Sequence, residues 1–293
     1  MEHTGSVPWP SWDQAALACA AALLAWAGIR RFRPGRFTRA AIPTLLEFAL
    51  ISGLYSIWRI ARELPFTHEA GAIGRARSLE RLQERLHLPS EIGLQHFAVD
   101  HEALARFINT YYATVHVPAL IAFLVWMWIF HRDKYPHWRS GLVYVTLGCL
   151  IIRFIRVAPP RFVPELGFVD LSDRLGFKVY GKPGTGISDQ YAAMPSIHVA
   201  WAAVVALGVL CVATGWWRWI VFLHLPITMY VVAATGHHWW FDGVVALLLL
   251  WAGLAFDTWW RRRTGRTSDS ELKSVELEEA TPQPRDGGTS LRT

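Results

Sequence analysis

The sequence predicts an all-α integral membrane protein: a six-helix transmembrane bundle core with one extra N-terminal span and outward-facing amphipathic helices. The chain has 293 residues, of which 53% are hydrophobic, and 16 are tryptophan. Apolar runs close to ~20 residues recur, and a helix of this length crosses ~30 Å of hydrocarbon. Tryptophan is enriched where a membrane meets water. The runs also lack the ~10-residue alternation that is typical of barrel strands.

Seven apolar runs predict seven spans. The first is the extra span, and the other six form the predicted core. The expected spans are residues 13–30, 44–61, 111–130, 141–158, 196–214, 218–235 and 242–260.

The spans divide the chain into three predicted parts. Residues 1–43 hold the first span and a basic loop, and residues 44–260 hold the six-span membrane domain with the polar sites described below. Residues 261–293 form a polar tail that cannot bury a core, so it is expected to be disordered. The first residues lack the basic region of a cleaved signal peptide, so none is expected.

Basic residues collect in the loops at one end of the predicted spans. Cytoplasmic loops carry an excess of Lys and Arg, so this end is expected to be cytoplasmic, with the N-terminus outside and the tail inside. The net charge of +6 therefore reflects topology, and no nucleic-acid partner is expected. The loop residues are Arg30, Arg31, Arg33, Arg36 and Arg39, then Arg132, Lys134 and Arg139, then Arg218, then Arg261, Arg262, Arg263 and Arg266.

The segment 62–110 lies on the opposite, outer side in this topology. Arginines alternate there with leucines that share a helical face, and a Pro-Ser pair then ends one helix and caps the next. Two interpretations remain open: a solvated helical hairpin over the bundle, or a helix in the outer interface that holds anionic head groups. The leucines are Leu79, Leu82 and Leu86, the pair is Pro89-Ser90, and a second amphipathic stretch carries Leu104, Phe107 and Ile108.

Two short polar sites interrupt the apolar sequence on this outer side. Ionisable groups at membrane depth are costly, and are functional candidates by default. One site is Pro195-Ser196-Ile197-His198, and the other is Gly236-His237-His238-Trp239-Trp240-Phe241-Asp242.

The spacing of these residues favours nucleophilic or acid–base chemistry. His238 and Asp242 are four residues apart, so on a helix their side chains can meet. A carboxylate bonded to one imidazole nitrogen sets the tautomer and leaves the other nitrogen as a nucleophile or base. Ser196 and the backbone N–H groups at the start of the next helix form an anion site that also carries His198.

Arginines at the exit of the fourth span complete this set of residues. Arg153, Arg156 and Arg161 flank Pro159-Pro160, and guanidinium groups suit phosphate oxygens. Two histidines, an aspartate, arginines and a helix N-terminus together favour phosphoryl transfer through a phosphohistidine.

Two other interpretations use the same residues. His198, His237, His238 and Asp242 could hold zinc, but the neighbouring arginines would repel a cation, so no metal or other cofactor is expected. A proton relay or transport site also uses buried His and Asp.

The remaining histidines and the cysteines have plainer interpretations. His237 is expected to point away from the site, and His224 is expected to be structural. His116 is interpreted as a polar contact between helices that could reach the site. The three cysteines are expected to be small apolar residues in helix packing; they are Cys19, Cys149 and Cys211.

The polar sites resemble motifs of the type 2 phosphatidic acid phosphatase superfamily of membrane lipid phosphatases. The Pro-Ser-x-His and His-x-x-x-Asp pair is similar to its second and third motifs. The wider context is similar to its inositol phosphorylceramide synthase-like, or inositolphosphotransferase, branch, and the resemblance covers roughly residues 44–260. The wider context is Ala158-Pro159-Pro160-Arg161, Tyr191 to His198, and His237 to Asp242.

The resemblance implies a role for each matching residue. His238 is the nucleophile, Asp242 is its partner, and His198 protonates the leaving group. Ser196 helps to bind phosphate, no metal is needed, and the six core spans are the second to the seventh.

Two departures from the family pattern change what is expected. The first motif lacks its lysine and has proline before arginine, so Arg161 is the favoured phosphate ligand, followed by Arg156 and then Arg153. Val232 stands where the third motif usually has an arginine. The same loss is typical of the branch that transfers a phospho-head group to an alcohol.

Two functions therefore remain from the sequence. The first is an enzyme that takes a membrane lipid substrate from the outer leaflet and passes its phosphate or phospho-head group to water or to a lipid alcohol. The second is a non-catalytic lipid-binding or transport protein that uses the same fold.

Overall fold

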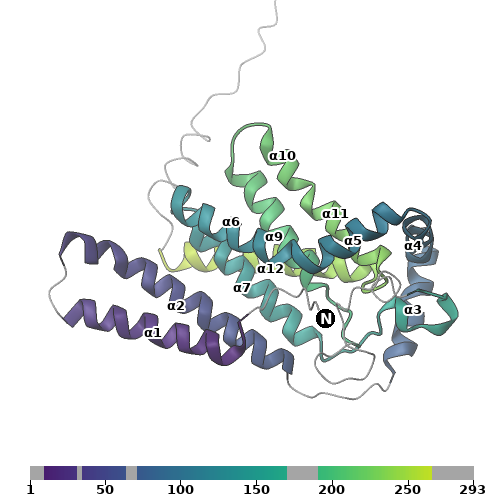
Figure 1. Ribbon diagram of the computed structural model, residues 1–293, viewed down its shortest axis with the longest axis horizontal. Coiled ribbons are helices and arrows are strands. Elements are labelled where there is room, and N and C mark those ends of the chain that lie inside the picture. Colours follow the sequence, from purple (N-terminus) through teal and green to yellow (C-terminus); the bar gives the residue numbers. More distant parts are fainter. Residues whose placement is uncertain (1–9, 32–34, 64–70, 170–190, 266–293) are drawn as a thin grey trace, which may run out of the picture.

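A computed structural model of the protein describes residues 10–31, 35–63, 71–169 and 191–265 (Figure 1). Within these ranges the chain is helical and forms no strand, apart from one isolated bridge between Val157 and Ala192. The all-α prediction is thus confirmed for the described residues. The helices are α1 (Trp12–Arg31), α2 (Arg36–Glu63), α3 (Ala72–Arg85), α4 (Glu91–Val99), α5 (Glu102–Thr114), α6 (His116–Phe130), α7 (Tyr135–Ile152), α9 (Ile197–Val212), α10 (Trp217–Phe222), α11 (His224–Ala234) and α12 (Trp240–Arg263), with the 3-10 turns η1 (Pro160–Phe162) and η2 (Pro164–Leu166).

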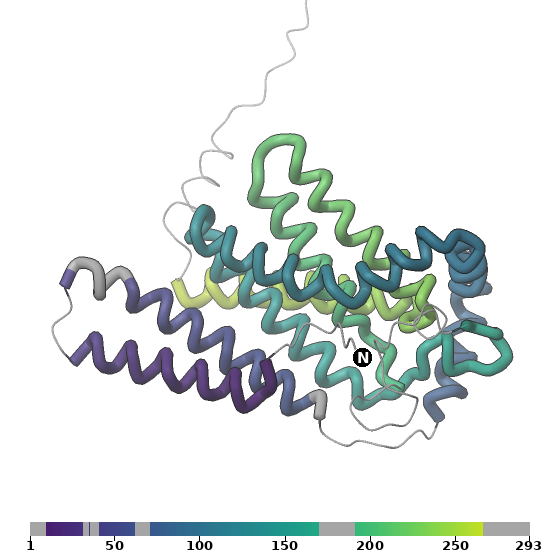
Figure 2. Tube along the Cα trace, viewed as in Figure 1, coloured from purple at the N-terminus to yellow at the C-terminus, as the bar shows by residue number. Residues whose placement is uncertain are grey.

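α1 and α2 form a hairpin at one side of the molecule, coloured purple in Figure 2. Within it, Ser56 Oγ donates to the carbonyl of Trp12 at 2.7 Å. Glu47 of α2 joins the hairpin to α7, because it accepts from Tyr135 at 2.9 Å and from Arg139 at 2.7 Å. α2 begins at Arg36, eight residues before the predicted span, so part of the expected basic loop is helical.

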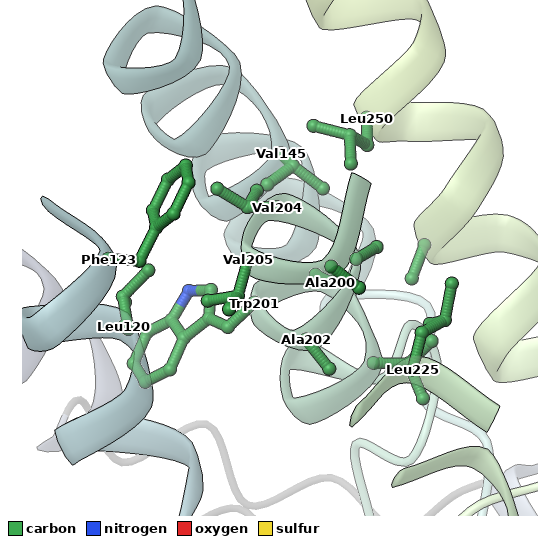
Figure 3. Close-up of a cluster of buried hydrophobic side chains, with 14 of the residues drawn as sticks. Leu120, Phe123, Val145, Ala200, Trp201, Ala202, Val204, Val205, Leu225 and Leu250 are labelled. Atoms are coloured by element: carbon green, nitrogen blue, oxygen red, sulfur yellow. The ribbon is translucent and has the colours of Figure 1, made fainter. Parts of the chain in front are cut away.

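α9 lies at the centre of the remaining helices. Eleven of its 16 residues are Ala, Val or Leu, and a helix that is apolar all round belongs in a core. Figure 3 shows side chains of α6, α7, α11 and α12 around it. A Cβ at Gly208 would lie 2.4 Å from the ring of Phe123, so this glycine allows α6 to approach α9 closely. The labelled side chains from the surrounding helices are Leu120, Phe123, Val145, Leu225 and Leu250.

The described helices meet the seven-span prediction only in part. Four are long and apolar enough to cross a membrane: Trp12–Arg31, Ala41–Ala61, Trp217–Ala234 and Trp240–Arg263. A fifth exists if α5 and α6, which meet at a 52° bend, form one span. α9 has 16 residues and is shorter than a full span, and α7 begins with polar residues that lower its hydropathy. These helices are consistent with a multi-pass membrane protein.

The helix α3 buries only Leu79 of the predicted leucine face, and it does so in part. Ala72, Ala76 and Gln83 are buried, whereas Leu82 and Leu86 are 42% and 54% exposed. Small side chains let α3 pack closely, and they leave these leucines on the outside of the segment.

The break between α3 and α4 is confirmed. Ser90 is the N-cap of α4, and its side chain accepts from the N–H of Gly93 at 3.4 Å. The predicted disordered tail lies outside the described residues from residue 266 onward, and so do residues 1–9 and 170–190.

Candidate active site at the helix ends

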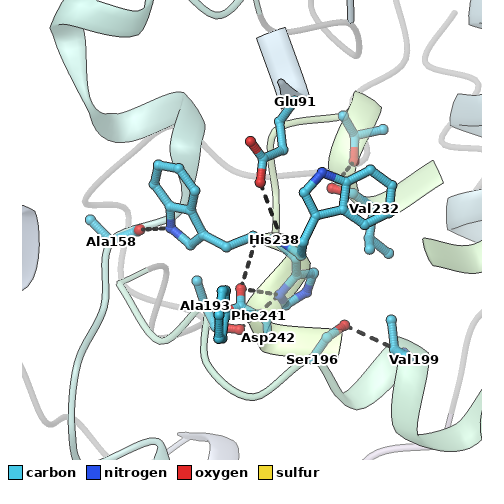
Figure 4. Close-up of polar contacts among 12 residues, drawn as sticks. Glu91, Ala158, Ala193, Ser196, Val199, Val232, His238, Phe241 and Asp242 are labelled. Carbon is cyan, nitrogen blue, oxygen red and sulfur yellow. Dashed lines mark hydrogen bonds and ion pairs between the residues drawn. The ribbon is translucent and has the colours of Figure 1, made fainter. Parts of the chain in front are cut away.

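The two predicted histidine sites meet, and Figure 4 shows Ser196 of one site near His238 and Asp242 of the other. His198 lies in the first turn of α9, and His238 lies two residues before α12. Their ring centroids are 5.8 Å apart, with an interplanar angle of 63°. The structure therefore brings together side chains that are far apart in the sequence.

The imidazole of His238 is held at one nitrogen. Nδ1 lies 2.7 Å from the carbonyl oxygen of Ala193 and 3.3 Å from Oδ2 of Asp242. Both partners are acceptors, so Nδ1 carries the proton and Nε2 keeps its lone pair. The shorter bond goes to the backbone of Ala193, a partner that a motif search cannot reveal because any residue supplies a carbonyl.

Asp242 has two functions in the geometry. Its Oδ2 accepts from the N–H of Trp239 at 2.8 Å, and the same oxygen faces His238. The carboxylate is fully buried in the first turn of α12, where the helix dipole favours negative charge. Asp242 therefore caps α12 and orients the imidazole at the same time.

The start of α12 is also capped by side chains from the outer segment. The N–H of Trp240 donates to Glu91 Oε1 at 3.2 Å, and the N–H of Phe241 donates to Gln83 Oε1 at 3.2 Å. Gln83 Nε2 donates to the same Glu91 oxygen at 2.7 Å. Both capping side chains are buried, and burial raises the pKa of Glu91. Free N–H groups at a helix start need such partners.

Sequence reasoning missed Glu91 and Gln83. One signal was present: Gln83 continues the spacing of Ala72, Ala76 and Leu79 on one face of α3. A polar residue on an otherwise small and apolar face indicates a specific buried partner.

Removal of the Glu91 carboxylate is expected to destabilise the protein. In Glu91→Leu the N–H of Trp240 and the amide of Gln83 lose their acceptor, which costs about 1–3 kcal/mol for a buried group. Glu91→Gln keeps an acceptor oxygen and is expected to cost about 1 kcal/mol or less. Thermal unfolding of the detergent-purified variants, followed by tryptophan fluorescence, measures the difference. Equal losses in the two variants would contradict the capping function.

Ser196 links the starts of α9 and α12, the two helices beside the histidine pair. It is fully buried and is the N-cap of α9, where its Oγ accepts from the N–H of Val199 at 3.3 Å. Its own N–H donates to the carbonyl of Asp242 at 3.2 Å. Two helix N-termini therefore converge beside the histidine pair, and such termini favour anions.

The loop after α7 packs against both histidine segments. α7 ends at Ile152, six residues before the predicted span end, because the following chain bonds to other segments instead of continuing the helix. The carbonyl of Val157 accepts from Ala193 at 3.0 Å, and that of Ala158 accepts from the Trp239 indole at 2.9 Å.

The predicted arginines lie in this loop. The N–H of Arg161 donates to the carbonyl of Gly236 at 3.1 Å, which places Arg161 next to the histidine turn. Arg156 is buried, and its carbonyl accepts from Arg75 of α3 at 2.5 Å. Arg153 is the C-cap of α7 and is half-buried.

Gly236 makes the close approach of this loop possible. Its φ is +66°, and an added Cβ would lie 2.6 Å from the ring of Phe168 and 3.2 Å from Cβ of Arg161. The next residue, His237, is buried, and burial together with the charge of Arg161 holds its pKa well below the usual value. The Arg161 charge therefore acts at the histidine turn.

Aromatic rings complete the site on the side of α5 and α6. The ring of Tyr112 stacks on His237 at 4.6 Å and lies 4.6 Å from the ring of His198. His116 reaches the site, because its ring centroid is 5.0 Å from that of His198. Among the described residues, no group of three or more His, Cys, Asp and Glu is arranged to hold a metal ion.

A histidine pair and an aspartate lie at two helix starts, beside an arginine loop, and form a candidate anion-binding site in a chain whose helices are consistent with a multi-pass membrane protein. Comparison with family models matches residues 77–256 to the PAP2 superfamily, and the chain belongs to this superfamily. Comparisons with curated proteins and with solved structures found no match. Members of the superfamily are phosphatases and phosphotransferases, so membership indicates an enzyme that acts on lipid phosphates. The match includes the whole histidine site and excludes α1 and α2.

Proposed function

We propose that the protein is a membrane lipid phosphatase or phosphotransferase that forms a phosphohistidine on His238. Its substrate is a lipid phosphate or phospho-head group at the outer leaflet. One observation carries the proposal: Nδ1 of His238 lies between two acceptors, so Nε2 has a lone pair, with His198 beside it.

The first half-reaction transfers the phosphoryl group to the enzyme. The lone pair of His238 Nε2 forms a bond to phosphorus as the bond from phosphorus to the lipid oxygen breaks. The bonding pair leaves with that oxygen, which takes a proton from His198. Asp242 and the Ala193 carbonyl stabilise the positive charge that develops on the ring of His238.

The second half-reaction restores the enzyme. Neutral His198 removes a proton from water or from an alcohol, and the acceptor oxygen forms a bond to phosphorus. The electrons of the phosphorus–nitrogen bond return to Nε2. No metal takes part in the proposed steps, because histidines move the protons and cationic side chains stabilise the phosphate charge.

Arg161 is the first candidate for phosphate binding, followed by Arg156 and Arg153. Support for Arg161 comes from its backbone bond to Gly236 and from its charge at His237. Ser196 contributes a hydroxyl whose oxygen already accepts from Val199, so its proton is directed to another acceptor.

The proposed branch is the inositol phosphorylceramide synthase-like one, which favours transfer to a lipid alcohol over hydrolysis. Its basis is Val232, which stands where phosphatases of the family usually have an arginine. Val232 is buried, and its carbonyl accepts from the N–H groups of His237 and His238 at 3.2 Å each. This position therefore supports the histidine turn through its backbone only.

The proposed side of the site is the non-cytoplasmic one. The site lies at the start of α12, whereas Arg261, Arg262 and Arg263 lie at its end. Arg132 likewise follows the end of α6 that is remote from His116. The positive-inside rule assigns such basic ends to the cytoplasm.

A lipid panel tests the function. Purified protein in phosphatidylcholine vesicles would be given phosphatidic acid, other lipid phosphates and inositol phospholipids, with and without ceramide or diacylglycerol. We expect a new phospholipid that depends on the alcohol, together with slower release of inorganic phosphate. Release of inorganic phosphate from a lipid phosphate, or of inositol phosphate from an inositol phospholipid, with no new phospholipid would assign a hydrolase. Lipid binding without either product would overturn the enzymatic proposal in favour of a binding or transport protein.

A further inference from the structure

A second group of polar side chains continues from the histidine pair into the bundle. His116 begins α6 and His224 begins α11. The ring of His116 lies 5.0 Å from His198 and 5.8 Å from His224. The hydroxyl of Tyr111 lies 2.5 Å from Nδ1 of His224, and its ring meets His116 edge-on at 5.5 Å. The proposed mechanism does not yet use these three residues.

His116 is buried without satisfying its ring nitrogens. The residue is 4% exposed, and neither Nδ1 nor Nε2 has a hydrogen-bond partner among the residues that the structure describes. Nε2 of His224 is also buried and has no hydrogen-bond partner among the described residues. Buried polar atoms in native proteins are nearly always hydrogen-bonded, so each exception calls for an explanation.

The surroundings of His116 favour a neutral polar group as its partner. The ionisable groups around His116 are the rings of Tyr111, Tyr112, His198 and His224 together with His238, whereas the charge of Arg161 acts on His237. A neutral imidazole offers one donor and one acceptor. A hydroxyl group is complementary, because it also donates once and accepts.

We propose that His116, supported by His224 and Tyr111, binds the hydroxyl of the acceptor and presents it to His198. This inference rests on the proposed function, and it concerns only the second half-reaction. The acceptor is water or an alcohol. Its oxygen forms the bond to phosphorus, its proton passes to His198, and the electrons of the broken phosphorus–nitrogen bond return to His238.

Two substitutions at His116 separate hydrogen bonding from packing. Leucine has a similar size but no polar atom, whereas asparagine keeps a donor and an acceptor. His137→Asn is the matched control. His137 also lies in a helix of the membrane domain, where its ring bonds to Asp257 at 2.7 Å. It is remote from the site, because it lies at the end of α7 opposite to the arginine loop.

The readout is the partition of the phosphoryl group between two acceptors. Phosphatidic acid in phosphatidylcholine vesicles is the donor, and glycerol is added as an alcohol that competes with water. The ratio of glycerol phosphate to inorganic phosphate does not depend on how much enzyme is folded. An alkaline quench in the first turnover measures the phosphohistidine, which survives base.

We expect His116→Leu to leave diacylglycerol release in the first turnover within about threefold of the wild type. The second step should slow about tenfold or more, the effect of losing about 1.4 kcal/mol of acceptor binding, so that phosphohistidine accumulates. The product ratio should change by more than about threefold, His116→Asn should recover most of it, and His137→Asn should not change it.

Two results would overturn the inference. One is an unchanged ratio in His116→Leu, and the other is equal slowing of both half-reactions, which a structural function alone explains. Failure of the proposed function has a different signature: no phosphohistidine forms in the wild type, or His238 variants still turn over.

Discussion

Replacement of His238 with alanine is expected to abolish turnover, with a loss in kcat/KM on the order of 10⁴-fold or more, because no other group replaces a covalent nucleophile. Nε2 is the atom left with a lone pair when Nδ1 bonds to Ala193 and Asp242. The measurement is product formation from a lipid phosphate in vesicles, together with a base-stable labelled phosphoenzyme in the wild type.

A second substitution separates chemistry from folding. His238→Asn keeps an N–H that can donate to the Ala193 carbonyl but has no nucleophilic ring nitrogen. We expect it to be as inactive as His238→Ala and to unfold closer to the wild-type temperature. Substantial turnover by either variant would remove His238 as the nucleophile and with it the phosphohistidine mechanism.

Replacement of His198 with glutamine is expected to slow the enzyme by about 10²–10⁴-fold on a lipid substrate, the range of general acid catalysis. The expected loss depends on the leaving group. A lipid alkoxide needs a proton as it departs, whereas p-nitrophenolate does not. The first-turnover release of p-nitrophenol from p-nitrophenyl phosphate should therefore fall much less, by about tenfold or less.

First-turnover kinetics are needed here, because in the proposed mechanism His198 also acts as the base when the acceptor attacks. His116→Asn is a suitable comparison, since it changes a neighbouring imidazole without removing the proposed acid. Equal losses of His198→Gln on both substrates would show that this residue does not protonate the leaving group.

The meeting of the two histidine sites was predictable from sequence. His198 and His238 each stand at the start of an apolar helix, and the basic loops lie at the other ends, so both histidines are expected on one side. The contact between His238 and Asp242, at 3.3 Å, was predicted, but its predicted basis was wrong. His238 precedes α12, so the two residues meet through the turn that Asp242 caps and not through a shared helical face.

The groups that support these residues were not predictable in the same way. The carbonyl of Ala193 is a backbone atom, and its position depends on the tertiary path of the loop. Glu91 and Gln83 cap the distant helix α12. The bond from Glu91 to Trp240 spans 149 residues of sequence, and the bond from Gln83 to Phe241 spans 158. The sequence marks Gln83 as a polar residue on an apolar helical face, but it does not identify partners so distant along the chain.

The span boundaries differ for a similar reason. Hydropathy extends the fourth span through residue 158. In the structure, however, the carbonyl of Val157 accepts from the N–H of Ala193, and the carbonyl of Ala158 accepts from the indole N–H of Trp239. Apolar sequence therefore marks both lipid-facing helix and a buried loop that shapes the site. Hydropathy alone does not separate the two.

The long-range caps of α12 also have a consequence for biosynthesis. Its N-cap is Trp239, not one of the residues that ordinarily cap a helix, so its first turn depends on Glu91 and Gln83 in addition to Asp242. When Glu91 and Gln83 leave the ribosome during synthesis, Trp240 and Phe241, whose N–H groups they cap, have not yet been translated. Contacts so distant along the chain form late. The site is therefore assembled near the end of synthesis. A truncated chain without α12 lacks Asp242 and the helix start that it caps, so the candidate site does not form in it.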